Sequence, residues 1–456
     1  PYKHLISLFY FDSFSKAMLV GTLINDYLDQ LIIEKNLSFA EVFKNVFWTN
    51  PLAFVLFSDD ELLEFRTKLK MQFDHLKALV SNRFDGLIED LGYCDLEPSF
   101  YSRKYGIQGR LDVFFKNNEV NRATIIELKS GKPYKPNLNG INRNHHVQAT
   151  LYKYLIQSVW PDLGQADCYI LYSVLSSGAL RISPESSSDF YSILQMRNQL
   201  LFLHFALAGQ SEKHLFDELH YRHFEKIDSF MLTKAKSVVD IYQNCDQLEK
   251  EYFKTYIAAV AREQIYSKLG STSSDTGVSG LWLVDAKQKE IEYNLIADLR
   301  IDEIVLERRE FPILLLKNKN GSSLSHNFRV GDTLLLYKQI QNKPDVMHQQ
   351  VYKCTLLEVQ PQMVHIRLRC RQFRENIDDV SSIWNLEHDH LDRSFIQQYQ
   401  NLHTFLSAES RIRKLYLSQE KPVLRTDASI YYASPELRTE HLTIIQRILN
   451  AQDYFL

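Results

Sequence analysis

The segment ATIIELKSGKPY, residues 123–134, places two charges inside a run that otherwise has the composition of a buried strand. Its isoleucines and leucine are residues that a core strand favours. Side chains alternate between the two faces of a strand, so Glu127 and Lys129 project from the same face. A buried carboxylate and a buried ammonium are costly unless they are paired or bind a cation. The segment therefore predicts either a cation-binding strand or a surface hairpin with a Glu–Lys pair.

A second carboxylate lies one short strand earlier. GIQGRLDVFF, residues 106–115, is separated from ATIIELKS by the polar turn KNNEVNR, so we expect the two strands to form a hairpin. In that hairpin, Asp112 and Glu127 can share a hard divalent cation. Lys129 would then neutralise charge and position the attacking water on a scissile phosphate. The pattern predicts metal-dependent hydrolysis of a phosphodiester.

Two predicted helices and one loop supply further polar candidates. HHVQATLYKYL places Gln148 and Tyr152 one helical turn apart, on one side of a helix. GTLINDYLDQLI belongs to an upstream helix, from about residue 14 to residue 31, that carries the polar Asn25. Glu97, in LEPSF, is either an additional acid near the site or a plain surface glutamate.

The sequence divides into three predicted parts. Residues 270–280, GSTSSDTGVSG, are small and polar and indicate a linker. Before them, residues 1–269 mix helices with a few strands. After them, residues 281–375 alternate in the manner of strands through LWLVDA, YNLIADLRI, FPILLLKN, VGDTLLLYKQI, VYKCTLLEV and MVHIRLRCRQ, which predicts a small antiparallel barrel or sandwich. Residues 376–456 are predicted to be mainly helical. The predicted fold class is α/β.

Bulk properties restrict the function classes. The 456 residues carry a net charge of −3, so nucleic-acid binding must come from local basic patches. The five cysteines are far apart and form no CxxC, which disfavours a disulfide framework or a local zinc site and indicates a reducing, cytoplasmic location. The longest apolar run, LLFLHFALAG, is too short to span a bilayer, so we expect no membrane partner.

GRLD, ELKSGK and QATLY, in this order and spacing, resemble the PD-(D/E)xK nucleases of the RecB type. The resemblance is nearest to the nuclease half of the replication nuclease–helicases that trim single-stranded DNA flaps and ends. It implies a restriction-endonuclease-like mixed sheet wrapped by helices, in which Asp112 and Glu127 bind Mg²⁺ or Mn²⁺. It also implies that Lys129 is catalytic, and that Gln148 and Tyr152 support the site and contact single-stranded or flap DNA.

Two departures from the family pattern bear on the metal. Relatives often carry a metal-binding histidine at the position of Asn25, whose amide oxygen is acceptable to Mg²⁺ but a poorer ligand for a transition metal. Glu97 is a further weak candidate for a ligand. Many relatives hold an iron–sulfur cluster through one cysteine before the core and three after it. Cys94 precedes the core, but no downstream triplet follows, so we expect no iron–sulfur cluster. A catalytically decayed DNA-binding and coupling module is the alternative function, and RNA stays open as a substrate.

The resemblance continues after the linker. FRVGDTLLLYK, VYKCTLLEV and VHIRLRC resemble the β-barrel that joins nuclease to motor in these enzymes, and WNLEHDHLDRSF resembles its stalk. ELRTEHLTIIQRILNAQDYFL resembles the start of a superfamily-1 helicase domain, although the GxxxxGK[ST] phosphate-binding loop is absent. We therefore expect a helicase motor as a partner domain and no ATP hydrolysis by this chain alone.

Six cations are candidates for DNA binding. Three lie in the loop after the catalytic strand, near the expected metal. The other three alternate with apolar residues in VHIRLRCRQ, so they share one face about 7 Å apart and can track a DNA backbone, unless that face is an ordinary solvent face. The six are Lys132, Lys135, Arg143, Arg367, Arg369 and Arg371.

Overall fold

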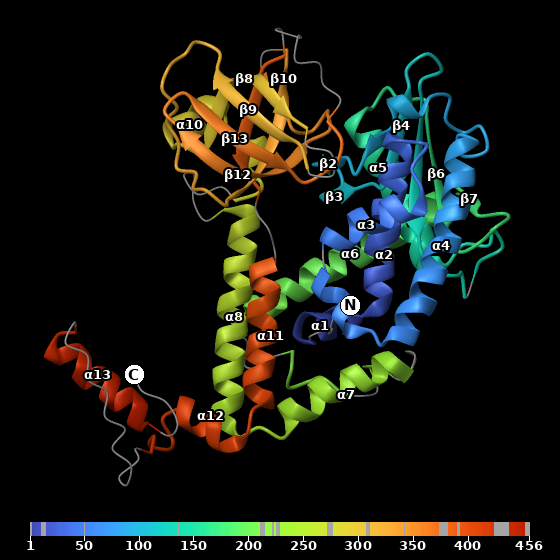
Figure 1. Cartoon of the computed structure of the whole chain (residues 1–456). Helices are drawn as coiled ribbons and strands as arrows, with labels where there is room; N and C mark the ends of the chain where they lie inside the picture. Colours follow the sequence, from blue (N-terminus) through green and yellow to red (C-terminus); the bar gives the residue numbers. More distant parts are fainter. Residues whose placement is uncertain are drawn as a thin grey trace. The chain divides into compact units, whose positions relative to one another are not determined.

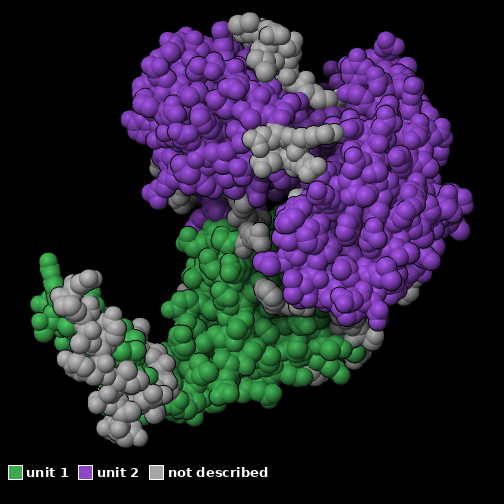
Figure 2. Space-filling view, viewed as in Figure 1, with its two compact units in different colours: residues 1–11, 200–264, 392–456 green, residues 12–199, 265–391 purple. Residues whose placement is uncertain are grey.

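The computed structural model describes most of the chain. The described residues are 2–10, 15–49, 51–134, 136–209, 215–220, 223–224, 229–270, 277–306, 311–341, 343–373, 382–389, 393–423 and 437–451. They belong to two compact units, shown in Figure 2. The smaller unit comprises residues 1–11, 200–264 and 392–456, and the larger unit comprises residues 12–199 and 265–391. No helix among the described residues is long and apolar enough to cross a membrane.

A mixed sheet of five strands organises the first half of the larger unit (Figure 1). Across the sheet, the strands are β1 (Asp95–Leu96), β4 (Val113–Asn117), β5 (Arg122–Lys129), β6 (Gln165–Tyr172) and β7 (Leu180–Ser183). β4 and β5 form the predicted antiparallel hairpin. β5 and β6 are parallel, so the chain crosses between them through helix α5 (Arg143–Val159). Strands β2 (Ser99–Ser102) and β3 (Ile107–Arg110) form a separate antiparallel pair.

Helices cover both faces of this sheet. The preceding helical elements are α2 (Lys16–Ile33), α3 (Phe39–Thr49), η1 (Pro51–Leu56), α4 (Asp59–Ser81) and η2 (Leu91–Tyr93). Ile126 and Leu128 of β5 belong to the core that these helices form, whereas Ile125 belongs to the core beneath α5. Because side chains alternate along a strand, Glu127 and Lys129 share the face of Ile125, toward α5. The expected mixed α/β sheet wrapped by helices is therefore confirmed.

A closed barrel of six strands forms much of the rest of the larger unit (Figure 1). The barrel strands are β8 (Leu295–Val305), β9 (Ile313–Asn318), β10 (Thr333–Ile340), β12 (Tyr352–Gln360), β13 (Met363–Leu368) and β14 (Trp384–His388), and the short β11 (Lys343–Pro344) pairs with the end of β10. The order β10-β12-β13-β9-β8-β14 closes because β14 also pairs with β10. Buried leucine, isoleucine and valine side chains fill the interior together with Trp384. The predicted small antiparallel barrel is confirmed.

Two stretches fold differently from their prediction. LWLVDA, expected as a strand, instead forms helix α9 (Gly280–Leu283) and leads into α10 (Ala286–Ile291), where Asp285 accepts a hydrogen bond from the Lys287 N–H and caps the helix. WNLEH, expected at the start of the helical stalk, is β14. Its Glu387 pairs with the buried Lys289 of α10 at 2.8 Å. Short apolar runs fit a strand and a buried helix equally well, so periodicity alone did not separate them.

The smaller unit is helical in its described part. It contains α1 (Tyr2–Phe9), α7 (Ser229–Gln243), α11 (Arg393–Ser407), α12 (Ser410–Tyr416), α13 (Thr439–Asn450), the end of α6 (Ser187–Ala208) and most of α8 (Gln247–Leu269). Phe9, Phe253 and Tyr399 meet in its buried core, where the Tyr399 hydroxyl donates to Gln264 Oε1 at 3.1 Å. The helices α6, α7 and α8 belong to residues 1–269, where the sequence predicts helices mixed with a few strands.

Within the larger unit, the barrel contacts the sheet half directly. The Val351 N–H donates to the Ser99 carbonyl at 2.9 Å, and Tyr101 packs against Val351 in a buried cluster. Arg371, which follows β13, reaches α2 and contacts Asp26 Oδ1 through Nη2 at 2.9 Å and through Nε at 3.1 Å. The Arg371 side chain is only 9% exposed. This arginine, a predicted DNA-binding cation, thus holds the barrel to the first helix of the unit.

Candidate active site

The hairpin brings the two predicted carboxylates together. β4 and β5 pair with Val113 opposite Ile126, so Asp112, the residue just before β4, comes opposite Glu127. The Leu128 N–H donates to Asp112 Oδ2 at 2.7 Å and fixes that side chain. GIQGRLDVFF was predicted as one strand, but β3 ends at Arg110 and β4 begins at Val113. Asp112 therefore lies in the bend between two strands.

Glu127 is the centre of a hydrogen-bond network. Its Oε1 accepts from Lys129 Nζ at 2.7 Å and from Gln148 Nε2 at 2.7 Å. Its Oε2 is buried and accepts no hydrogen bond from a donor in the described part of the chain. Glu127 is 4% exposed, whereas the Lys129 side chain is 21% exposed. This burial is inconsistent with a surface hairpin carrying a solvated Glu–Lys pair.

Helix α5 supplies the second side of this network. Gln148 and Tyr152 lie one turn apart, as predicted, and Gln148 Nε2 is 3.0 Å from the Tyr152 hydroxyl. That hydroxyl donates to the Arg110 carbonyl at 2.8 Å. Gly109, the glycine of GRLD, allows β3 to lie close to α5. A Cβ at this position would lie 2.8 Å from Leu155 Cδ2 and 3.0 Å from Tyr152 Cε1. A side chain at this position would collide with α5.

A small pocket, too tight to hold a water molecule, adjoins Asp112. Its lining consists of Asn25, Leu28, Asp29, Glu97 and Asp112. Glu97 adopts a left-handed backbone with φ of 51°, which is uncommon outside glycine and is over-represented at functional sites. Its N–H donates to the Asp112 carbonyl at 3.0 Å. The two weaker predicted ligands, Asn25 and Glu97, thus lie beside the aspartate of the hairpin.

Asp29 is the residue of this pocket that sequence reasoning missed. It is 5% exposed and four residues after Asn25 on α2, so both project from the same face of the helix. The signal was present in the sequence: GTLINDYLD spaces Gly21, Asn25 and Asp29 at intervals of four along an otherwise apolar face. Gly21 lies near the end of β5, since a Cβ there would be 3.7 Å from Ser130 Oγ.

Burial raises the pKa of every carboxyl in this group. Burial, followed by the neighbouring Glu127 charge, raises the pKa of Asp112 to about 7. Burial also raises the pKa of Glu127, although Lys129 opposes the rise. The pKa of Asp29 lies well above its ordinary value because of burial and the nearby Glu97, and burial raises the pKa of Glu97 too. Four acids this close cannot all ionise without a compensating positive charge.

The donor set fits a hard divalent cation. No three His, Cys, Asp or Glu side chains in the described residues form a group that could hold a metal by themselves. Mg²⁺, however, is usually held by one or two carboxylates while it keeps several waters and binds substrate phosphate oxygens. Asp112 and Glu127 provide the two carboxylates, with Glu127 Oε2 lacking a donor among the described residues. Asn25 adds a neutral amide near Asp112.

The remaining predicted cations differ in their surroundings. Lys132 and Arg143 are exposed, and Lys135 lies outside the described residues. Arg367 and Arg369 are exposed on the barrel and line a cleft that also contains Glu97. Of the three arginines in VHIRLRCRQ, these two present their charges to a concave surface.

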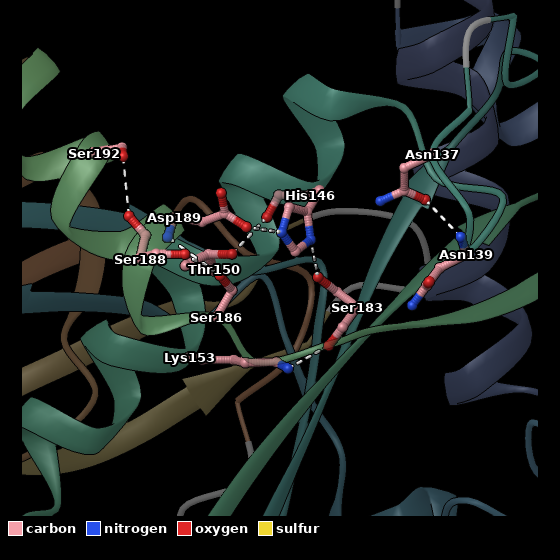
Figure 3. A network of polar contacts seen from close by, with 10 residues as sticks. All are labelled: Asn137, Asn139, His146, Thr150, Lys153, Ser183, Ser186, Ser188, Asp189 and Ser192. Carbon is pink, nitrogen blue, oxygen red and sulfur yellow. Dashed lines mark hydrogen bonds and ion pairs between the residues drawn. The ribbon is translucent and has the colours of Figure 1, made fainter.

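The second histidine of α5 ties three elements together (Figure 3). His146 Nδ1 lies 2.7 Å from Ser183 Oγ of β7, and His146 Nε2 lies 3.2 Å from Asp189 Oδ2 of α6. Lys153 also donates to the Ser183 carbonyl. Ser183 is fully buried, so this Ser–His–Asp arrangement is closed to a substrate and serves to position α5.

The first histidine of α5 lies near the lysine of the hairpin. Burial, together with the Lys129 charge, lowers the pKa of His145 to about 4, so the imidazole is neutral at pH 7. The Tyr172 hydroxyl accepts from the Asn142 N–H at 3.1 Å and lies 2.9 Å from His145 Nδ1. The neutral ring can therefore accept a hydrogen bond from the Tyr172 hydroxyl.

Comparisons with known proteins add little to this geometry. No protein-family model matches the chain, and no curated protein matches it. Among solved structures, the chain is similar to a crystal structure of a "putative exonuclease" from Eubacterium rectale, with 14% identity and a TM-score of 0.27. The similarity covers 43% of this chain and 69% of the other. A TM-score at this level carries no argument, so the candidate site rests on its own residues.

Proposed function

We propose that this chain is a metal-dependent nuclease that hydrolyses phosphodiester bonds in single-stranded DNA, at ends or flaps. One observation carries the proposal: the hairpin sets Asp112 opposite Glu127, all three side chains including Lys129 are at least partly buried, and Glu127 is bonded both to Lys129 and to Gln148 of α5. In this geometry, the three motifs GRLD, ELKSGK and QATLY contribute residues to one group of neighbouring side chains. The resemblance of those motifs to RecB-type nucleases supplies the reaction class and the choice of DNA.

Each residue has a distinct role in the proposed reaction. A divalent cation, when bound, would lower the pKa of a water and polarise the phosphate. Asp112 and Glu127 would hold that cation, and Gln148 keeps the Glu127 carboxylate in place through its 2.7 Å hydrogen bond. Lys129 is exposed enough to meet the substrate and would stabilise the charge that develops on the phosphate oxygens. Tyr152 orients Gln148 and anchors to the Arg110 carbonyl.

Cleavage of end-labelled single-stranded and flap DNA in Mg²⁺, Mn²⁺ or EDTA tests the proposal. We expect cutting with either ion and none in EDTA. Lys129→Ala should lower kcat by about 10²- to 10³-fold with little change in DNA affinity, because the ammonium acts on the transition state. Lys116→Ala is the matched control, since this lysine of β4 packs over the Trp160 ring. Near wild-type cutting by Lys129→Ala would exclude the role assigned to it.

A decayed nuclease that only binds DNA is the second candidate. Asn25 favours it, because an amide stands in the pocket where related nucleases often carry a histidine ligand. Such a module would bind single-stranded DNA without cutting it in either metal. The resemblance of the last helix, α13, to the start of a superfamily-1 helicase domain supports the further proposal that a helicase motor works with this chain.

A further inference from the structure

A cleft of about 340 Å³ lies between the β2–β3 pair and the barrel, inside the larger unit. Glu97, Ser99 and Arg110 line it from the β2–β3 side, and the barrel contributes residues of β12, β13 and the segments beside them. Glu97 lines both this cleft and the small pocket next to Asp112, so the cleft lies one residue away from the candidate metal site. A second hollow of about 220 Å³ shares Ser99, Arg110 and Lys353 with it and extends it along β3.

Positive charge dominates the lining of this cleft. It contains four cations, Arg110, Lys353, Arg367 and Arg369, and one carboxylate, Glu97. Arg110 contacts Glu97 at 3.3 Å, and Lys353 contacts Asp389 at 3.1 Å. No ion pair is recorded for Arg367 or Arg369 within the described residues, and both side chains are exposed. The two arginines are two positions apart along the chain, so their side chains project about 7 Å from each other. This distance is close to the separation of neighbouring phosphates in an extended single strand of nucleic acid.

The cleft also offers an apolar wall. Phe311 is half-buried in its lining, and the Arg371 guanidinium lies over its ring, 5.2 Å from the centroid. Aromatic side chains stack on bases irrespective of sequence, and cationic grooves follow the phosphates of single strands. A small molecule with a single anionic group would leave Arg367 or Arg369 without an ionic partner among the described residues. A polyanion that continues from the candidate metal site would pair with them in succession.

We propose that this cleft binds the sugar–phosphate backbone of a single-stranded polynucleotide, so that the barrel supplies part of the substrate site beside the carboxylates. The inference deepens the proposed nuclease function and rests on it for the position of the scissile phosphate. Its binding claim is independent of cleavage. Contacts to phosphates carry no information about the base sequence, so the cleft would accept a polynucleotide of any sequence.

The test compares two double variants of the whole chain with equal changes in charge. Arg367→Glu with Arg369→Glu alters the cleft, whereas Arg329→Glu with Lys343→Glu alters two exposed barrel cations that do not line it. Binding is followed by fluorescence anisotropy of labelled single-stranded DNA, single-stranded RNA and duplex DNA in EDTA, in a Lys129→Ala background. We expect the cleft variant to raise Kd at least about tenfold and to lower the salt slope by about 1.4, because two single-strand phosphate contacts are lost.

The control variant, Arg329→Glu with Lys343→Glu, should have the same Kd and the same salt slope as its parent. Equal losses for DNA and RNA support recognition of the backbone, and a loss confined to DNA supports recognition of its sugar as well. An unchanged Kd and salt slope in the cleft variant, or an equal loss in the control, would overturn the inference even in a chain that cuts DNA. A chain that never cuts but loses binding in the cleft variant keeps the inference and refutes the nuclease. Arg367→Gln with Arg369→Gln replaces the cleft variant if charge reversal prevents folding.

Discussion

At the scale of single residues, the charged pair inside a core strand is explained by its surroundings. Glu127 accepts hydrogen bonds from Lys129 and Gln148 while its second oxygen has no donor among the described residues. The alternation of strand side chains was enough to predict that Glu127 and Lys129 share a face. Asp29 was not predicted: its spacing of four residues from Asn25 shows a shared helix face, but only tertiary packing brings Glu97 and Asp112 beside it.

The raised pKa of Asp112 makes the stability of the metal-free protein depend on pH. In the unfolded chain the Asp112 carboxyl has its ordinary pKa of 3.8, whereas in the folded protein its pKa is about 7. The stabilisation is therefore complete at low pH and is lost as the pH rises toward and through 7. Asp112→Asn keeps an oxygen for the Leu128 N–H but carries no charge. We expect it to stabilise the metal-free protein by about 1–2 kcal/mol at pH 8 and much less at pH 4.

Thermal unfolding in EDTA at both pH values measures this difference. Glu119→Gln, in the exposed turn between β4 and β5, is the matched control and should show no such pH dependence. Equal Tm changes for Asp112→Asn at pH 4 and pH 8 would show that the aspartate is not held protonated by folding.

At the scale of elements, the hairpin and α5 were predictable because each has a strong local pattern. The short polar turn between GRLD and ELKSGK predicts a hairpin. The four-residue spacing of Gln148 and Tyr152 predicts that both lie on one face of α5. The exchange of strand and helix at LWLVDA and WNLEH had no local signal, because the cap at Asp285 and the buried Lys289–Glu387 pair are decided by packing. Short apolar segments carry the weakest sequence signal for telling a strand from a buried helix.

The contact between β3 and α5 gives a prediction at this scale. Gly109→Ala places a methyl 2.8 Å from Leu155 Cδ2 and 3.0 Å from Tyr152 Cε1, so α5 or these side chains must shift. We expect a loss of about 1–3 kcal/mol in the free energy of unfolding, and a lower kcat because Tyr152 orients Gln148. Denaturant unfolding and single-turnover cleavage measure the two effects.

Gly21→Ala is the control for stability. The added Cβ meets Ser130 Oγ at an ordinary 3.7 Å, and alanine favours a helix, so stability should stay the same or rise. If Gly109→Ala were as stable as the parent protein and equally active, the close approach of β3 to α5 would have no role in the site.

At the scale of the whole molecule, contacts distant in sequence were beyond prediction. Arg371 and Asp26 are 345 residues apart, and no periodicity links them. The same holds for the smaller unit, which combines α1, most of α8 and α11 from three separate stretches. The sequence predicted the barrel as a part of its own, yet the cleft it lines includes Glu97, which also lines the small pocket next to Asp112. A proposed substrate site thus draws on residues from both sides of the linker.

The central claim is that Asp112 and Glu127 together bind a divalent cation. Calorimetric titration of the intact chain with Mg²⁺ at pH 8, where the carboxyls are most readily ionised, tests it most directly. We expect the parent protein and Glu119→Gln to bind Mg²⁺, and Glu127→Gln, which retains an oxygen for Lys129 but no charge, to lose at least about tenfold in affinity. Unchanged Mg²⁺ affinity in Glu127→Gln would contradict the account and place the cation elsewhere.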